Sequence, residues 1–255
     1  MPTRLSYYRL PNLAYLARRW PHSVYHLPHQ LHPSLSYMKT YQLCLMAGFS
    51  KSPAARHHSA IPHKAVKILA SYHDKVRRPN AYHNKAHTAQ VILNAGLLAQ
   101  KAGLRQAQID LLIVAALIHD YDHLGYHRSK AAFWQELESL KKALPILLSA
   151  GMDARLAKLL TDYVLATSLY DNSMSQRESD NSVKALLLDA DLFASLFSAR
   201  TKSWKLTAHL KFEDRQTDEL PEMIARFISY CRQSGFASSV AQHMHEKLPS
   251  DHSYL

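Results

Sequence analysis

The chain has 255 residues, of which 47% are hydrophobic and 20% charged, a composition ordinary for a globular protein that buries a large core. No uncharged apolar run approaches the roughly 18 to 20 residues that span a bilayer, so the sequence predicts no transmembrane segment. The two cysteines, Cys44 and Cys231, are too few for a disulfide framework or a zinc-thiolate site and favour a reducing compartment. We therefore expect a cytoplasmic location.

Positive charge is concentrated in the N-terminal part of the chain. The formal net charge is +11, and residues 1–73 contain nine Lys or Arg and no Asp or Glu. Three interpretations are open: a basic helical layer packed on the domain, an organelle-targeting segment, or a patch that contacts an acidic surface. Because no zinc finger, RNA-recognition signature or basic-aromatic repeat accompanies the charge, we do not expect nucleic-acid binding.

We divide the chain into a basic N-terminal extension, residues 1–60, and one folded domain, residues 61–255. From Ile61 onward the apolar residues recur at helical spacing. The predicted helices occupy residues 66–72, 91–103, 111–120, 133–148, 156–165, 183–197, 221–232 and 236–247. With six glycines, no Asn-Gly turn and no sustained alternation, a sheet has little support. The sequence predicts an all-α, compact multi-helix bundle with one long polar loop at 170–181.

Two short stretches, residues 82–87 (YHNKAH) and 118–123 (IHDYDH), carry most of the candidate chemistry. Each is weak alone, because 17 histidines make chance His pairs common. The second stretch, however, ends an apolar run that should be a buried helix. An ionisable pair at that place costs desolvation free energy unless it is hydrogen-bonded or binds a metal. By contrast, we expect His73 and Asp74 to be an ordinary hydrogen-bonded histidine beside a capping aspartate.

A third stretch, residues 187–192 (LLDADL), again places acidic residues inside a strongly apolar helix. In helical proteins, metal ligands usually come from different helices and converge on one point. The candidate ligands are His87, His119, Asp120 and one acid from Asp189 and Asp191. Two imidazoles with two carboxylates suit zinc, and an aspartate can bridge to a harder ion such as magnesium or manganese.

In this order the stretches resemble the HD-domain metal-dependent phosphohydrolases, most closely the class I 3′,5′-cyclic-nucleotide phosphodiesterases. The resemblance covers about residues 64 to 247 and leaves out the first 60. The similar segments are 82–87 (the family's Y-H-N-x-x-H), 116–125 (A-x-x-H-D-x-D-H-x-G), 164–167 (L-A-T-D), 190–192 (A-D-[IL]) and 233–236 (Q-x-G-F). It implies a compact HD-domain bundle with a metal site at its centre.

Carried over by position, the resemblance implies roles for individual residues. The tighter ion, zinc, would be bound by His87, His119, Asp120 and Asp191, and Asp120 would also reach a second ion, magnesium or manganese. His83 would be the general acid, while Asp122 and His123 would orient the ligands and waters. Substrate binding would involve Tyr82, Gln233, whose amide would face the nucleobase, and Phe236, which would stack on it.

The implied reaction is hydrolysis of a 3′,5′-cyclic nucleotide to the 5′-nucleotide. A hydroxide bridging the two metals would attack phosphorus in line, and His83 would protonate the leaving 3′ oxygen. Three departures from the family pattern limit this expectation. Ser168 stands where an acid normally follows Leu-Ala-Thr, Ala194 stands where an asparagine is expected, and the stretch between Asp120 and Asp191 is short. The second metal and the choice between adenine and guanine are therefore open.

Two other functions compete with this one. An HD-domain phosphohydrolase acting on another nucleotide phosphate ester would keep the metal ligands without needing Gln233 and Phe236, and a Gln-x-Gly-Phe segment can also be a helix end with a buried phenylalanine. A non-enzymatic protein, either a degenerate nucleotide binder or a basic anchoring protein, would fit the loss of the acid at Ser168. Metal content separates these classes, because an anchor needs no metal.

Overall fold

The computed structural model describes residues 39–50, 61–76, 80, 82–123, 133–168, 182–200, 222, 229 and 235–246, with side chains of the 182–200 segment up to 194. Eight helices lie in these ranges: α3 Thr40–Ala47, α4 His63–Lys75, α5 Lys85–Ala102, α6 Gln106–Ile118, α7 Trp134–Ser149, α8 Ala154–Leu165, α9 Val183–Arg200 and α12 Ser239–Glu246. No strand occurs among the described residues, so the all-α prediction is confirmed.

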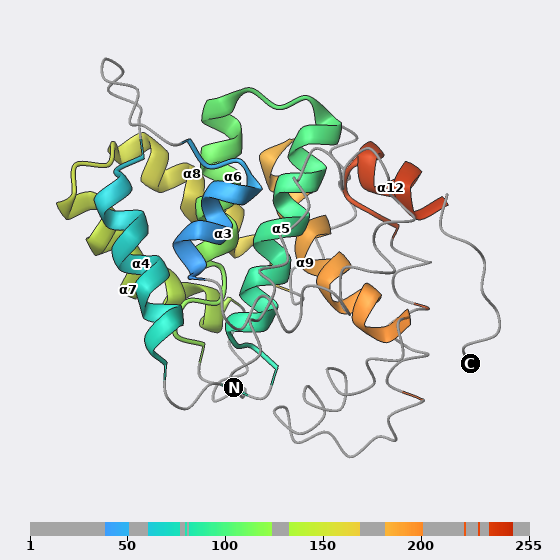
Figure 1. The fold of residues 1–255 in the computed structure, drawn as a ribbon, viewed down its shortest axis with the longest axis horizontal. Coiled ribbons are helices and arrows are strands. Elements are labelled where there is room, and N and C mark those ends of the chain that lie inside the picture. Colours follow the sequence, from blue (N-terminus) through green and yellow to red (C-terminus); the bar gives the residue numbers. More distant parts are fainter. Residues whose placement is uncertain are drawn as a thin grey trace, which may run out of the picture.

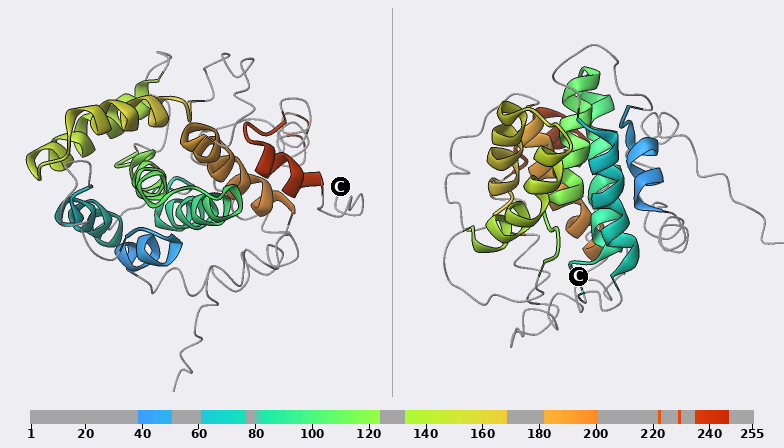
Figure 2. Two further views of the ribbon diagram at one scale, coloured as in Figure 1. Left: turned by 90° about the horizontal axis from the view of Figure 1, so that it is seen from above. Right: turned by 90° about the vertical axis from the view of Figure 1, so that its left-hand side faces the viewer.

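Helices α5 and α6 form the centre of the bundle. Every residue of α6 from Leu111 to Ile118 is buried, and so is most of α5. Figure 2 shows these two helices surrounded by α3, α4, α7, α8 and α9, while α12 lies at the periphery and contacts α5. A helix that is apolar on all sides needs cover on all sides, which explains the central place of α6.

Local signals fix where the central helices begin and end. Asn84 caps α5, because its side chain accepts hydrogen bonds from the first backbone N–H groups, and Gly103 ends the helix in a left-handed conformation at φ 66°. The turn to α6 is short, so α5 and α6 run antiparallel (Figure 1). As a result, the start of α5 and the end of α6 meet at one end of the bundle.

Part of the basic N-terminal extension belongs to the core. In α3 and two residues beyond it, Leu43, Cys44, Ala47 and Phe49 are buried, and α3 packs on α4 and α5. The close approach of α3 to α5 requires Gly96, where an added Cβ would overlap the backbone of Ala47. Residues 39–50 therefore pack as a helical layer on α4 and α5.

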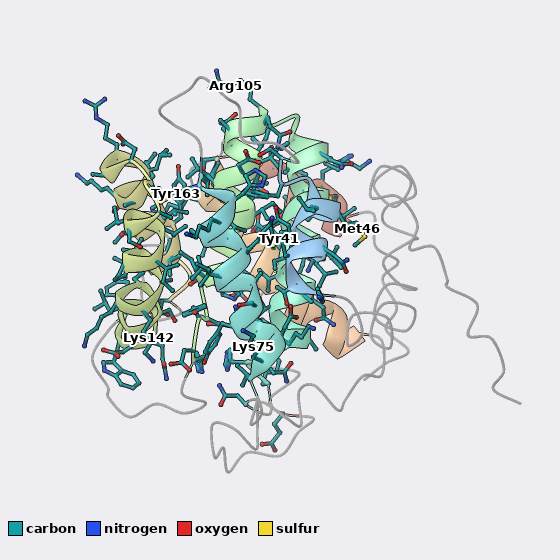
Figure 3. All side chains as sticks on the ribbon, turned by 60° about the vertical axis from the view of Figure 1, so that its left-hand side comes forward. Tyr41, Met46, Lys75, Arg105, Lys142 and Tyr163 are labelled. Carbon is teal, nitrogen blue, oxygen red and sulfur yellow. The ribbon has the colours of Figure 1, made fainter. Side chains whose placement is uncertain are left out.

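The remaining expectations about organisation are met only in part. None of the helices in the described ranges is both long and apolar enough to cross a membrane. The described residues do not include residues 1–38 and 51–60, the predicted loop 170–181, or the predicted helix 221–232 apart from two isolated residues. Figure 3 marks the two ends of the bundle: Lys75 closes α4 at one end, and Arg105 lies in the α5 to α6 turn at the other.

Candidate metal centre

The first histidine motif is held at the start of α5. Asn84 Oδ1 accepts from the backbone nitrogens of Ala86 at 2.8 Å and His87 at 3.4 Å. Its amide nitrogen donates to the backbone oxygen of Asn80 at 3.1 Å, and the Asn80 side chain donates in turn to the backbone oxygen of His123. The two asparagines therefore connect the start of α5 to the turn that follows α6.

At the end of α6, His119 is oriented by a backbone hydrogen bond. Its Nδ1 lies 2.9 Å from the oxygen of Ala116, and because a carbonyl only accepts, Nδ1 carries the proton. The neutral ring then presents a bare lone pair at Nε2, the state a metal ligand requires, and a backbone carbonyl is a usual partner for the other nitrogen. His119 is 1% exposed.

The third contribution comes from α9, where two aspartates two residues apart face different surroundings. Asp189 accepts from the backbone nitrogens of Ala237 and Ser238, each at 2.8 Å, and from the Ser238 hydroxyl at 2.5 Å. Asp191 lies instead beside the two histidines. The structure therefore brings together Asp191, rather than Asp189, with His87 and His119.

The four predicted ligands converge on one point. His87 Nε2 lies 3.2 Å from both Asp120 Oδ2 and Asp191 Oδ1, and His119 Nε2 lies 3.1 Å and 3.9 Å from the same oxygens. The two Nε2 atoms are 3.4 Å apart. Bonds of about 2.0 to 2.1 Å to a tetrahedral zinc put neighbouring ligand atoms about 3.3 to 3.4 Å apart. Four of these five separations, 3.1 to 3.4 Å, are close to this spacing, and the fifth, between His119 Nε2 and Asp191 Oδ1, is longer at 3.9 Å, so the cluster could hold a divalent metal ion.

The cluster is closed on the imidazole side and open on the carboxylate side. The side chains of His87 and His119 are 3% and 1% exposed, whereas those of Asp120 and Asp191 are 17% and 29% exposed. An ion bound here would have protein behind it and an accessible face in front. Catalytic metal sites keep such an open position, whereas structural zinc sites are enclosed by their ligands.

Electrostatics also favour a cation at this point. Burial disfavours charge on His87, but the Asp120 and Asp191 carboxylates outweigh it and raise the pKa of His87 to about 10. Burial likewise opposes a raised pKa at His119, yet the nearby Asp120 raises it. The histidines in turn hold the pKa values of both aspartates below their usual range, against the effect of burial. A divalent ion bound here would replace the protons on the two histidines as the positive charge that balances the carboxylates.

A second group shares one member with the first. Ligand atoms of His83, Asp120 and His123 lie within 4.8 Å of one another. The rings of His83 and His123 stack, with centroids 3.9 Å apart and planes 21° apart. Asp120 therefore stands between two sets of imidazoles, the position that a carboxylate bridging two ions would occupy.

Asp122 and Tyr82 border the cluster without belonging to either group. Asp122, which has a left-handed backbone at φ 56°, contacts the Tyr72 hydroxyl and accepts from Lys142 Nζ at 2.6 Å. Its described contacts therefore tie the turn after α6 to α4 and α7. Tyr82 is 6% exposed, and its ring centroid lies 5.0 Å from that of His87, so the two rings pack together.

The last motif is described only in part. Gln233 lies outside the described residues. Phe236 is 5% exposed and stacks on Phe193 of α9, with ring centroids 4.7 Å apart. The loop that carries it is anchored by Asp189, whose pKa burial raises to about 6 against the donors that lower it. This packing is what a helix end with a buried phenylalanine predicts.

One polar residue near the centre, Glu136, did not stand out in the sequence. Burial raises the pKa of the half-buried Glu136 on α7, and the charges of Asp120 and His119 act on it. Ser168, which replaces the family's acid, lies close to Glu136, yet its buried hydroxyl makes no hydrogen bond of normal geometry within the described residues. No sequence motif surrounds Glu136. Only the packing of α7 shows that its carboxylate lies near Ser168, the position where the family pattern has an acid.

Together, these residues form two groups of three that could each hold a cation, one of His87, His119 and Asp191 and one of His83, Asp120 and His123. Asp120 connects the two groups, because its Oδ2 also lies 3.2 Å from His87 Nε2 and 3.1 Å from His119 Nε2. Neither the known protein-family models nor the curated protein sequences match this chain.

Proposed function

We propose that this chain is a metal-dependent phosphohydrolase that converts a 3′,5′-cyclic nucleotide to the 5′-nucleotide. The observation that carries the proposal is the convergence of His87, His119, Asp120 and Asp191 at the spacing of ligands around one cation, with an open carboxylate face. The nucleotide substrate rests on the motif resemblance alone.

The donor set suggests which ions it would hold. Two neutral imidazoles and two carboxylates favour zinc at the tight site. Asp120 would reach the second ion, for which magnesium or manganese is the better match, and Glu136 would hold waters around that ion in place of the acid absent at Ser168. When bound, such ions activate water and neutralise charge on the phosphate.

The remaining residues handle protons and orientation. The 3′ oxygen of the ribose is a poor leaving group unless it is protonated as the bond to phosphorus breaks. His83, an imidazole beside Asp120, would donate this proton. His123 stacks on the His83 ring and limits its rotation. Tyr82 also packs on His83, edge to face, with ring centroids 4.9 Å apart. Two ring contacts thus restrain the His83 side chain.

The first experiment measures hydrolysis of cyclic AMP and cyclic GMP by the purified chain with added Mg²⁺ or Mn²⁺. Its control is the His119→Ala, Asp120→Ala double variant, in which we expect both bound metal and turnover to be lost. Bound metal without turnover of either nucleotide would contradict the cyclic-nucleotide assignment, and absence of bound metal would contradict the metal centre itself.

The role of His83 is tested by changing the leaving group. His83→Asn should lower cyclic-nucleotide turnover by roughly 10² to 10⁴ while leaving the metal content unchanged. The same variant should lose much less activity on bis(p-nitrophenyl) phosphate, because p-nitrophenolate leaves without a proton. Loss of metal in His83→Asn would show that His83 is a ligand, and equal losses on both substrates would exclude proton donation.

One observation favours a second candidate, a phosphohydrolase that acts on another nucleotide phosphate ester. Phe236 is almost completely buried against Phe193, so little of its ring is available for a nucleobase. If the base does not bind to Phe236, then Phe236→Leu should leave KM for cyclic nucleotides unchanged. A clear rise in KM with intact thermal stability would support base stacking and the cyclic-nucleotide substrate.

A further inference from the structure

Asn94 is a buried polar residue at the contact between α5 and α9. It is 5% exposed, and its amide nitrogen donates to the backbone oxygen of Ala190 at 3.1 Å. Ala190 directly precedes Asp191 in the chain. On α5, Asn94 follows His87 by seven residues, two helical turns, so both residues lie on the same face.

The surroundings make this amide unusual. The residues about one turn away on the same face of α5, Val91 and Leu98, and the α9 residues Leu187 and Phe193 are apolar and buried. Apolar packing is not directional, so it holds two helices together without fixing how far one slides along the other. A hydrogen bond between a side chain of one helix and a backbone atom of the other does fix this register. Single buried polar residues set helix register in the same way in coiled coils.

Register matters because Asp191 is the only predicted ligand from α9. His119 and Asp120 are adjacent, so their relative positions follow from the chain itself. Asp191 reaches His87 across the α5 to α9 contact, with 3.2 Å between Oδ1 and Nε2. A shift of one residue along a helix moves a side chain by about 1.5 Å and turns it by about 100°, whereas metal-ligand distances hold to within about 0.2 Å.

We propose that Asn94 is a positioning residue that sets the register of α9 on α5, so that Asp191 reaches the metal ion. The inference rests on the proposed metal centre. The residue acts through Ala190 and Asp191 and touches neither ion nor substrate. The Asn94 amide lies among apolar side chains, where a leucine of similar size would also be expected to pack. We therefore attribute to Asn94 the orientation of α9 and not the stability of the fold.

The test compares Asn94→Leu and Asn94→Ala with the matched control Thr88→Val in the full-length chain. Thr88 is buried on the same helix and closer to His87, but its hydroxyl donates to the backbone oxygen of Asn84 at the start of α5. Zn²⁺ affinity is measured by competition with a chelator. Thermal midpoints are measured without metal, and the visible absorption spectrum is recorded with Co²⁺ in place of zinc.

In both Asn94 variants we expect the Zn²⁺ dissociation constant to rise about 10- to 100-fold, the range seen when a ligand's outer partner is removed. The midpoint of metal-free Asn94→Leu should not fall, and its Co²⁺ spectrum should shift toward that of Asp191→Ala. Thr88→Val should keep the wild-type affinity and spectrum. Wild-type affinity and spectrum in Asn94→Leu, or the same losses in Thr88→Val, would overturn the role of Asn94 alone. A wild-type chain that binds no Zn²⁺ would overturn the metal centre and this inference together.

Discussion

Two carboxylates of α9, two residues apart, show how differently a buried acid can be accommodated. Asp189 is 1% exposed and accepts two backbone N–H groups and a hydroxyl. Asp191 faces two imidazoles and the charge of Asp120, which works against its ionisation. The hydrogen-bond donors around Asp189 stabilise its carboxylate without a bound metal ion. Asp191 lies among side chains that offer lone pairs, and a bound cation would satisfy them.

Two buried histidines repeat the contrast. His73 Nε2 donates to the backbone oxygen of Leu117 at 3.0 Å, and burial lowers the pKa of His73 to about 4. His119 has the same kind of backbone bond at Nδ1, but its second nitrogen points at Asp120, which raises its pKa despite burial. Burial alone therefore does not mark a functional site. What distinguishes the cluster is that its groups face one another.

The largest effect should separate the two aspartates. Asp191→Asn removes a charged ligand and should weaken metal binding by more than about 100-fold, since even an outer partner of a ligand contributes 10- to 100-fold. Asp189→Asn should retain wild-type metal content. Bound metal is measured by mass spectrometry of the purified chain after dialysis. The reverse pattern would show that Asp189 is the ligand.

Stability should show the opposite order. Asp189→Ala leaves two backbone N–H groups and the Ser238 hydroxyl without their acceptor, and should lower the free energy of unfolding by about 3 to 5 kcal/mol. Metal-free Asp191→Ala should lose less, because it removes the attraction between Asp191 and His87 but also the repulsion from Asp120, and His87 keeps its contact with Asp120. Urea unfolding in the presence of a chelator measures both. Equal losses would contradict the contrast between the two acids.

Sequence reasoning found seven of the eight described helices, all except α3, because their apolar stripes are local. The helix predicted at 133–148 occupies Trp134–Ser149, and that at 156–165 begins only two residues earlier, at Ala154. His73 and Asp74 also behave as expected: the histidine is hydrogen-bonded, and Asp74 caps α3 through Thr40. These features depend on neighbours in the chain or on the cost of burying charge.

Other features depend on packing and left no local signal. Positions 189 and 191 are equally acidic in an apolar run, and only the motif resemblance favoured Asp191. The bond from Asn94 to Ala190 joins residues 96 positions apart. Glu136 reaches the surroundings of Asp120 because α7 folds back beside α6. Such contacts are set by how the helices pack, which a single sequence does not state.

The contrast between the histidines should appear as a pH dependence. Because the pKa of His73 is about 4 when folded and 6.5 when unfolded, the unfolded chain binds the proton more readily. The contribution of His73 to the free energy of unfolding should be constant above pH 6.5 and fall as the pH drops toward 4, by which point up to about 3 kcal/mol is lost. Urea unfolding from pH 7.5 to 4.5 with chelator should show a shallower slope for His73→Gln than for wild type. Parallel slopes would exclude this origin.

The smallest effect tests a third carboxylate, Asp122, which follows the ligand Asp120 by two residues. Lys142 Nζ lies 2.6 Å from Asp122 Oδ2, and both side chains are about one third exposed, so water and salt screen the pair. Lys142→Met should cost about 0.5 kcal/mol, and less in 1 M NaCl. The neighbouring Lys141, 3.6 Å from Glu138 and 76% exposed, supplies the matched control, and Lys141→Met should have no measurable effect. Metal affinity should stay at the wild-type value in both variants. If Lys142→Met weakens metal binding, then Asp122 helps to orient the residues around the metal, as the motif resemblance implied, and it belongs with Asp191 and not with Asp189.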